Sequence, residues 1–180
     1  MIPLTSELVA IGKTATDKAD AIAQAVDLLT AAGKIDPRYG QSMLGREAVA
    51  NTFLGNGIAI PHGLPQDRDL IHDTAIAVVQ LPAGVEWAPG DIAHLVVAIA
   101  AKSDEHLQVL SNLTDVLGDA AEAGRLATTT DAAEIVARLT GAAAPVAAPA
   151  AAPADFARGI DVVVTGAHGL HARPATTLVD

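Results

Sequence analysis

Cysteine is absent from the 180-residue sequence, so disulfides, thiolate catalysis and sulfur-ligated metal sites are excluded. Aromatic residues make up 2% of the chain, while apolar residues make up 51%. A core must therefore be built from Ala, Val, Ile and Leu, which suits helices packed on a sheet. No run reaches the roughly 18 uncharged apolar residues of a membrane span, and no signal peptide is evident at the start. The sequence predicts a cytoplasmic protein without membrane insertion.

Basic side chains are also scarce. Eleven Lys and Arg stand against 21 Asp and Glu, giving a formal net charge of −10. A chain without a basic stripe cannot neutralise many phosphates, which argues against nucleic acid as a partner. Residues 1–142 alone carry nine basic and eighteen acidic side chains, so we expect an acidic surface that suits a basic protein partner.

Residues 1–140 alternate between helical and strand patterns and predict one α/β domain. Asp131, with Glu134 three residues later, has the spacing of a capping box at a helix start. The expected helices cover residues 16–32, 37–51, 104–117 and 131–139, and the expected strands cover residues 58–60, 75–81 and 95–100.

An Ala/Pro-rich segment, residues 141–155, separates this domain from the C-terminal residues. Its prolines recur every four residues, which prevents a continuous helix and favours extended, semi-stiff chain. Beyond it, "GIDVVV" is typical of a strand and "HARPATTLV" of a helix start. We expect residues 156–180 to be the N-terminal part of a second domain that is cut off, because about 25 residues cannot bury a core alone.

His62 occupies the most constrained position of the six histidines, in "GNGIAIPHGLP". Pro61 fixes the direction of approach, Gly63 leaves space beside the ring, and the preceding apolar run places the imidazole at a strand end. Strand ends are where α/β proteins usually place their chemistry. The alternative is a purely structural histidine. We expect His72 and His94, which lack such a context, to be structural or exposed.

Two residues are candidate partners of His62. His106, in "SDEHLQVL", falls in the first turn of an expected helix, where free N–H groups favour an anion; its alternative is a solvated surface residue. Arg46, on the second expected helix, has a fork of donors that suits a phosphoryl group; its alternative is an ordinary ion pair with Glu47 or another acid. A nucleophilic histidine, an arginine and a helix start together suit phosphoryl transfer.

The stretches "TFLGNGIAIPHG", "IAAKSDEHLQVLSNLT" and "LGREAVAN" resemble the fructose/mannitol-type enzyme IIA domain of the bacterial phosphoenolpyruvate-dependent sugar phosphotransferase system. The resemblance spans most of residues 1–140 and implies a mixed β-sheet flanked by helices. It also implies that His62 is the phosphorylated nucleophile, that His106 is its neighbour in the pocket, and that Arg46 steadies the phosphoryl group.

"GLHARPA", residues 169–175, is similar to the active-site motif of the phosphocarrier protein HPr. Here His171 stands at the threshold of an expected helix, and a phosphoryl group on it would meet free N–H groups and the guanidinium of Arg173. A helix-capping histidine without a role is the alternative. Enzyme IIA followed by HPr resembles the fructose-specific multiphosphoryl transfer proteins, in which an enzyme I domain often follows.

These resemblances imply a relay that starts from phosphoenolpyruvate, with no cofactor or metal in this chain. Enzyme I and HPr would supply the phosphoryl group, and a sugar-specific enzyme IIB/IIC permease would receive it. Fructose is favoured over mannitol. Two alternatives remain. One is a metal-dependent hydrolase in which His62, His106 and a carboxylate such as Asp104 bind zinc, although no tight ligand spacing supports it. The other is a regulatory IIA-like module not coupled to transport.

Overall fold

The computed structural model describes residues 4–103, 111 and 118–141. Its five strands form one mixed sheet in the order β1-β4-β5-β3-β2, where β4 and β5 pair antiparallel in the centre and both β1 and β3 run parallel to their inner neighbours. The strands are β1 (Val9–Ala10), β2 (Phe53–Gly55), β3 (Ile58–Ala59), β4 (Ala75–Ala88) and β5 (Asp91–Ala100). The α/β class with a mixed sheet flanked by helices is confirmed.

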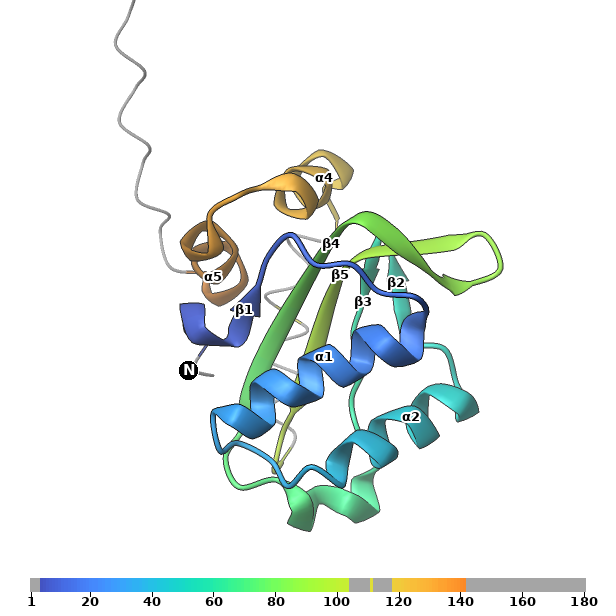
Figure 1. Ribbon diagram of the computed structural model, residues 1–180, viewed down its shortest axis with the longest axis vertical. Helices are drawn as coiled ribbons and strands as arrows, with labels where there is room; N and C mark the ends of the chain where they lie inside the picture. The colour runs from blue at the N-terminus through green and yellow to red at the C-terminus, as the bar shows by residue number, and fades with distance from the viewer. Residues whose placement is uncertain (1–3, 104–110, 112–117, 142–180) are drawn as a thin grey trace, which may run out of the picture. The chain divides into compact units, whose positions relative to one another are not determined.

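Helices α1 (Lys18–Ala31) and α2 (Tyr39–Val49) lie across the same face of the sheet, as Figure 1 shows. The two short helices α4 (Ala120–Thr128) and α5 (Ala132–Thr140) follow at the β1 side, and the 3-10 segments η1 (Ser6–Leu8) and η2 (Pro65–Leu70) precede β1 and β4. None of the helices in the part of the chain that the structure describes is long and apolar enough to cross a membrane.

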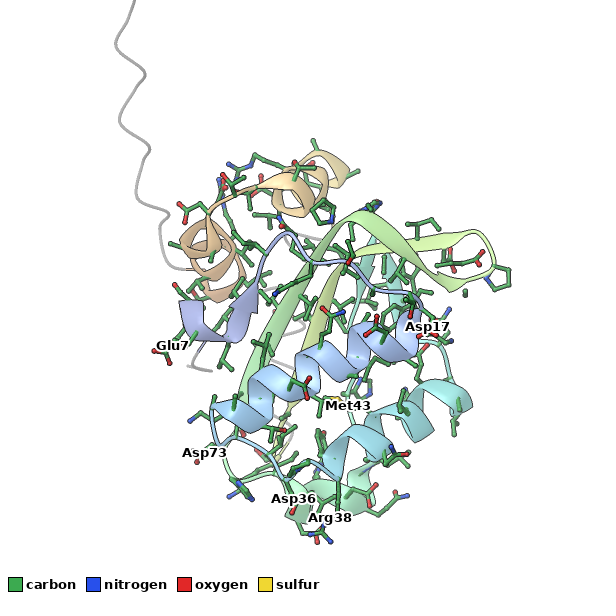
Figure 2. The ribbon with its side chains drawn as sticks, in the orientation of Figure 1. Glu7, Asp17, Asp36, Arg38, Met43 and Asp73 are labelled. Atoms are coloured by element: carbon green, nitrogen blue, oxygen red, sulfur yellow. The ribbon has the colours of Figure 1, made fainter. Side chains whose placement is uncertain are left out.

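Small and β-branched side chains fill the core, as the scarcity of aromatics predicts. Along the central pair, Ala75 faces Ala100 and Ala77 faces Ala98, all completely buried, so the helices can approach the sheet closely. Met43 lies between α1 and α2, where its flexible side chain fills the gap (Figure 2). Because β4 is buried continuously from Ala75 to Leu81, both faces of the sheet are covered there.

Two predicted strands are too short. The strand expected at 75–81 runs on to Ala88, and its partner begins at Asp91 rather than at residue 95. The pair passes Pro82 through a register shift between Gln80 and Val85 and continues as a hairpin arm that extends from the sheet (Figure 1). Proline is tolerated at such irregular positions. The sequence-based prediction ended the strand before Pro82, whereas the strand in the structure continues past it.

Of the two hydrogen bonds of the capping box expected at Asp131, only the one accepted by the Asp131 side chain forms, so the prediction of a full box is wrong. The Asp131 carboxylate does accept the Ala133 N–H at 2.8 Å and caps α5. Its own backbone N–H, however, donates to the Thr129 hydroxyl, which in turn donates to Glu134. The Thr129 hydroxyl therefore links the Asp131 backbone N–H to the Glu134 carboxylate, two groups that the predicted box would bond directly.

Helix α4 and strands β1 and β2 were not predicted, and the helix expected at 104–117 lies outside the described residues apart from position 111. Asp119 caps α4 by accepting N–H groups of Ala121 and Glu122. Asp119 followed by Glu122 has the same spacing that marks the start of α5, so the signal for α4 was present in the sequence.

Gln80 is a buried polar residue that ties three parts of the fold together. Its side-chain amide donates to the carbonyls of Leu126 and Thr129, each at 2.8 Å, and its side-chain oxygen accepts the Gly12 N–H at 2.9 Å. Only 1% of the residue is exposed. A hydrophobic replacement would leave these backbone groups without their partner.

We therefore expect Gln80→Leu to lower the free energy of unfolding by about 1–3 kcal/mol, the cost of unsatisfied buried polar groups. Urea unfolding followed by circular dichroism measures this change. Gln41→Ala, at an exposed position of α2, is the matched control and should change stability by less than about 0.5 kcal/mol. Equal stability of the two variants would contradict the assigned role of Gln80.

Candidate functional site

A tight hairpin turn sets the strand that leads to His62. Asn56 and Gly57 both have positive φ, 48° and 75°, as a two-residue type I′ turn requires, and they connect β2 to β3. The Asn-Gly pair is a strong hairpin signal that the sequence-based prediction did not use. Ile58 and Ala59 then pair in parallel with Leu95 and Val96 of β5, so the chain arrives at Pro61 in a fixed register.

Hydrogen bonds hold the backbone on both sides of His62. Before it, the carbonyl of Pro61 accepts the Ile99 N–H at 2.9 Å, and His62 itself bridges to Ile99 in parallel pairing. After it, the Gly63 N–H donates to the Tyr39 hydroxyl at 3.0 Å and the Leu64 N–H to the Ser42 hydroxyl at 2.8 Å. The sheet and α2 therefore fix the position from which the imidazole projects, at the end of β3 as predicted.

The tautomer of the His62 ring is fixed by the main chain. Nδ1 lies 2.9 Å from the carbonyl oxygen of Ile60. A carbonyl oxygen can only accept, so Nδ1 carries the proton, and in the neutral ring Nε2 then carries the lone pair. The ring is half-buried. Nε2 is thus the nucleophilic atom of this histidine.

A pocket of about 120 Å³ adjoins His62. This volume is well below the roughly 300–1,000 Å³ of typical small-molecule sites. It suits a group of a few heavy atoms, and the two arginines on its wall suit an anion. The described residues that line the pocket are Tyr39, Arg46, His62, Gly63, Pro65, Arg68, Ile99 and Ala101.

Arg46, predicted as a partner of His62, lies on the wall of this pocket. It sits in the last turn of α2, where its Nη1 donates to the Ala50 carbonyl at 2.9 Å and so holds the side chain at the helix end. The alternative of an ion pair with Glu47 is wrong. Glu47 is buried on another side of the helix, where it accepts the Thr52 N–H at 3.1 Å and pairs with Lys18 at 3.4 Å.

Tyr39 and Arg68 were not among the residues predicted from the sequence. Tyr39 is 3% exposed, and its ring packs against Gly63 so closely that a Cβ there would lie 2.4 Å from a ring carbon. This close approach is the reason for glycine after His62. Arg68, half-buried in η2, is six positions beyond His62, and its charge was not weighed because nothing local distinguishes it from a surface arginine.

Of the remaining predicted site residues, His106, Asp104, His171 and Arg173 lie outside the described residues, as do the segments 142–155 and 156–180. His72 is exposed, with Nδ1 3.2 Å from the Gly33 carbonyl. The half-buried ring of His94 packs against Gly57 and Gly84, with its Nδ1 3.2 Å from the Leu81 carbonyl. Neither belongs to the pocket, and within the described ranges no cluster of three potential metal ligands occurs.

The fold and the pocket define a class of protein: a small α/β domain that places a histidine beside arginine side chains in a small pocket. The family model described as "Phosphoenolpyruvate-dependent sugar phosphotransferase system, EIIA 2" matches residues 3–141. The chain belongs to this family and is therefore a phosphoryl-transfer component of that system, as the resemblance implied.

Three relatives illustrate the family. A multiphosphoryl transfer protein of Rhodobacter capsulatus is 94% identical over 168 residues, which cover 93% of this chain but only 20% of that protein. The crystal structure of the mannitol IIA of Escherichia coli superposes with a TM-score of 0.72 at 38% identity, covering 77% of this chain and 99% of the other. A complex of that IIA with phosphorylated IIB gives a TM-score of 0.73 at 38% identity and covers 78% of this chain and 99% of the other.

The contact between Gly63 and Tyr39 predicts a specific pattern of stability. Gly63→Ala should lower the free energy of unfolding by about 1–3 kcal/mol, because the new methyl group collides with the Tyr39 ring. Gly45→Ala in α2, where an added Cβ meets the Leu64 side chain at an ordinary 3.6 Å, is the control and should not destabilise the protein.

A double-mutant cycle isolates this contact. The cost of Gly63→Ala should shrink when Tyr39→Ala has already removed the ring. Urea unfolding of the four proteins gives the coupling free energy. An undiminished cost in the Tyr39→Ala background would place the strain elsewhere than at the ring.

Burial raises the pKa of Tyr39 above its usual value of about 10, and this effect is partly offset by the Gly63 hydrogen bond and the Arg68 charge. Tyr39 is the single tyrosine of the chain, so phenolate absorbance in an alkaline titration reports on it alone. The folded protein should titrate at higher pH than the urea-unfolded chain.

This difference in phenol pKa links the stability of the fold to alkaline pH. The folded state holds its phenolic proton more tightly, so this contribution is complete below the unfolded pKa and is lost as the pH rises from that value through the folded one. In Tyr39→Phe the loss of stability over this alkaline range should be smaller. Superimposed titration curves of folded and unfolded protein would contradict the burial effect.

Proposed function

We propose that His62 accepts a phosphoryl group from phospho-HPr and passes it to a sugar-specific enzyme IIB. The observation that carries this proposal is the ring geometry: Nδ1 is bound to the Ile60 carbonyl, while the same small pocket holds His62 and Arg46. A fixed neutral imidazole beside a guanidinium is what phosphoryl acceptance requires.

In this reaction the lone pair of Nε2 attacks phosphorus in line with the bond to the donor's imidazole nitrogen. The new N–P bond forms as the donor N–P bond breaks, and the electron pair of the broken bond stays with the donor ring. Arg46 donates to the equatorial oxygens, where the negative charge concentrates. The Nδ1 proton stays hydrogen-bonded to the Ile60 carbonyl, which stabilises the positive charge that the ring gains.

The size of the pocket supports a carrier rather than a sugar kinase. At about 120 Å³ it suits a phosphoryl group, whereas a site for a hexose would need more room. The sugar would then bind on the permease, consistent with the solved complex of the mannitol IIA with phosphorylated IIB. We propose that no metal takes part in this step, because arginine supplies the positive charge, and that His106 completes the pocket as the family resemblance implies.

The second phosphoryl site of the proposal is His171, with Arg173 beside it, in an HPr domain that begins at about residue 156. The 14 residues from Gly141 to Ala154 span roughly 40 Å when extended. Such a tether keeps donor and acceptor at an effective concentration of millimolar order. Relatives named multiphosphoryl transfer proteins support a chain with more than one phosphoryl site. We propose enzyme I as the source of the phosphoryl group from phosphoenolpyruvate and fructose as the favoured sugar, as the family resemblance implies.

His62→Ala should abolish stoichiometric phosphate acceptance by residues 1–141 when the protein is incubated with phosphoenolpyruvate, enzyme I and intact HPr. Acid-labile phosphate located by peptide mapping measures it. His72→Ala removes an exposed histidine outside the pocket and serves as the control, with acceptance as in the wild type. Full acceptance on residues 1–141 of the His62→Ala protein would refute the assignment.

The same preparation separates transport from regulation. After removal of the donors, phosphorylated protein should transfer its phosphoryl group to a fructose-specific enzyme IIB. Phosphorylation on His62 without transfer to any sugar-specific IIB would favour the regulatory alternative.

A further inference from the structure

Two arginines from distant elements reach the same small pocket. Arg46 comes from the end of α2 and Arg68 from η2, and both line it together with His62. Each is half-buried. Two guanidinium groups on the wall of one small pocket present several N–H donors, which suits an anion with several acceptor oxygens.

The backbone that carries Arg68 is firmly placed. The segment η2 starts at Pro65, directly after Leu64, whose N–H is bound by Ser42. Within η2 the Asp67 N–H donates to Leu64, and at its end the Leu70 carbonyl accepts the Asp36 N–H at 2.8 Å. Arg68 is therefore presented to the pocket by a chain segment that is fixed relative to α2 and to His62.

The surroundings of Tyr39 agree with this placement. The positive charge of Arg68 lowers the pKa of the Tyr39 phenol, whose hydroxyl binds the N–H next to His62, while Asp67 raises it. Asp67 is the nearby acid on the same segment, and Asp69 acts on Arg38 at the surface. The Arg68 charge therefore acts on Tyr39, whose hydroxyl accepts the backbone N–H of the residue after His62.

The oxygens of a phosphoryl group can bind more than one arginine. They carry about −1.5 to −2 charges at neutral pH, and one guanidinium offsets only part of that. A guanidinium has five N–H donors, so Arg68 can serve a phosphoryl oxygen and a protein acceptor at the same time. Bidentate arginine contacts to such oxygens are among the strongest hydrogen bonds in proteins.

Building on the proposed phosphorylation of His62, we propose that Arg68 is a second phosphoryl ligand, which donates hydrogen bonds to the phosphoryl oxygens on His62 alongside Arg46. The two arginines then neutralise the dianion from two different elements. Arg68 contacts the transferred group itself and so acts as a catalytic residue of both transfer steps.

Arg68→Gln tests this role against a matched control, Arg38→Gln. Both changes remove one positive charge and alter long-range attraction of HPr alike, but Arg38 is on the surface, paired with Asp36 at 2.9 Å, and does not line the pocket. We expect Arg68→Gln to slow phosphate acceptance from phospho-HPr about 10- to 100-fold, comparable to Arg46→Gln. Arg68→Lys should recover part of the rate, and Arg38→Gln should stay within about twofold of the wild type.

Phosphorus NMR of the phosphorylated proteins distinguishes contact from docking. Removing a cation that touches the phosphoryl group should raise the pKa of that group. Its chemical shift should therefore titrate at higher pH in Arg68→Gln than in the wild type, and at the wild-type pH in Arg38→Gln. A normal rate in Arg68→Gln would overturn the inference. So would a slow rate with an unchanged phosphoryl titration, since Arg68 would then act only on HPr docking.

Failure of the proposed function gives a different result. If the wild-type protein shows no phosphohistidine at His62, the function itself is refuted, and the role of Arg68 with it. If His62 is phosphorylated normally and only the Arg68 variants match the wild type, the function stands and the second ligand does not. Urea unfolding of each variant ensures that a slow rate is read only from a folded protein.

Discussion

The contact between the Tyr39 ring and the backbone of Gly63 is the constraint on which the site depends. It brings α2 against the chain that leaves the sheet, and the hydroxyl of the same ring binds the Gly63 N–H. Ser42, one turn further along α2, binds the next N–H. Since Arg46 follows on the same helix, the position of the guanidinium relative to His62 is set by the packing that fixes the imidazole itself.

The composition of the core makes this close packing feasible. Alanine pairs across β4 and β5 keep the centre of the sheet thin, and the buried strands leave little freedom for the helix layer above them. Two of the four aromatic residues are deeply buried: Trp87 in the hairpin arm, and Tyr39 against the backbone next to His62.

The sequence was most informative where local constraints accumulate. His62 stands between Pro61 and Gly63 after an apolar run, so its position at a strand end could be predicted from neighbours alone. Arg46 could be proposed from its residue type and its family motif. Tyr39 and Arg68 could not be predicted as site residues, because they reach the pocket through contacts between separate elements. No periodicity in the sequence indicates that Tyr39 contacts a residue 24 positions away.

Element boundaries failed for a related reason. The hairpin arm beyond Leu81 continues past a proline because cross-strand pairing with β5 resumes after a register shift, which is a property of the pair and not of either strand. Helix α4 and the β2–β3 hairpin, in contrast, carried usable local signals in Asp119 with Glu122 and in Asn56 with Gly57. These were omissions of interpretation, whereas the hairpin arm required tertiary information.

The hydrogen bond from Nδ1 of His62 to the Ile60 carbonyl bears on the direction in which the phosphoryl group is transferred. In the proposed reaction the proton stays at this hydrogen bond during arrival and departure of the phosphoryl group, so neither step waits for a proton to leave or enter the pocket. The same arrangement then serves forward and reverse transfer equally. Mass action among the partner proteins, rather than the pocket, would decide which way the phosphoryl group moves.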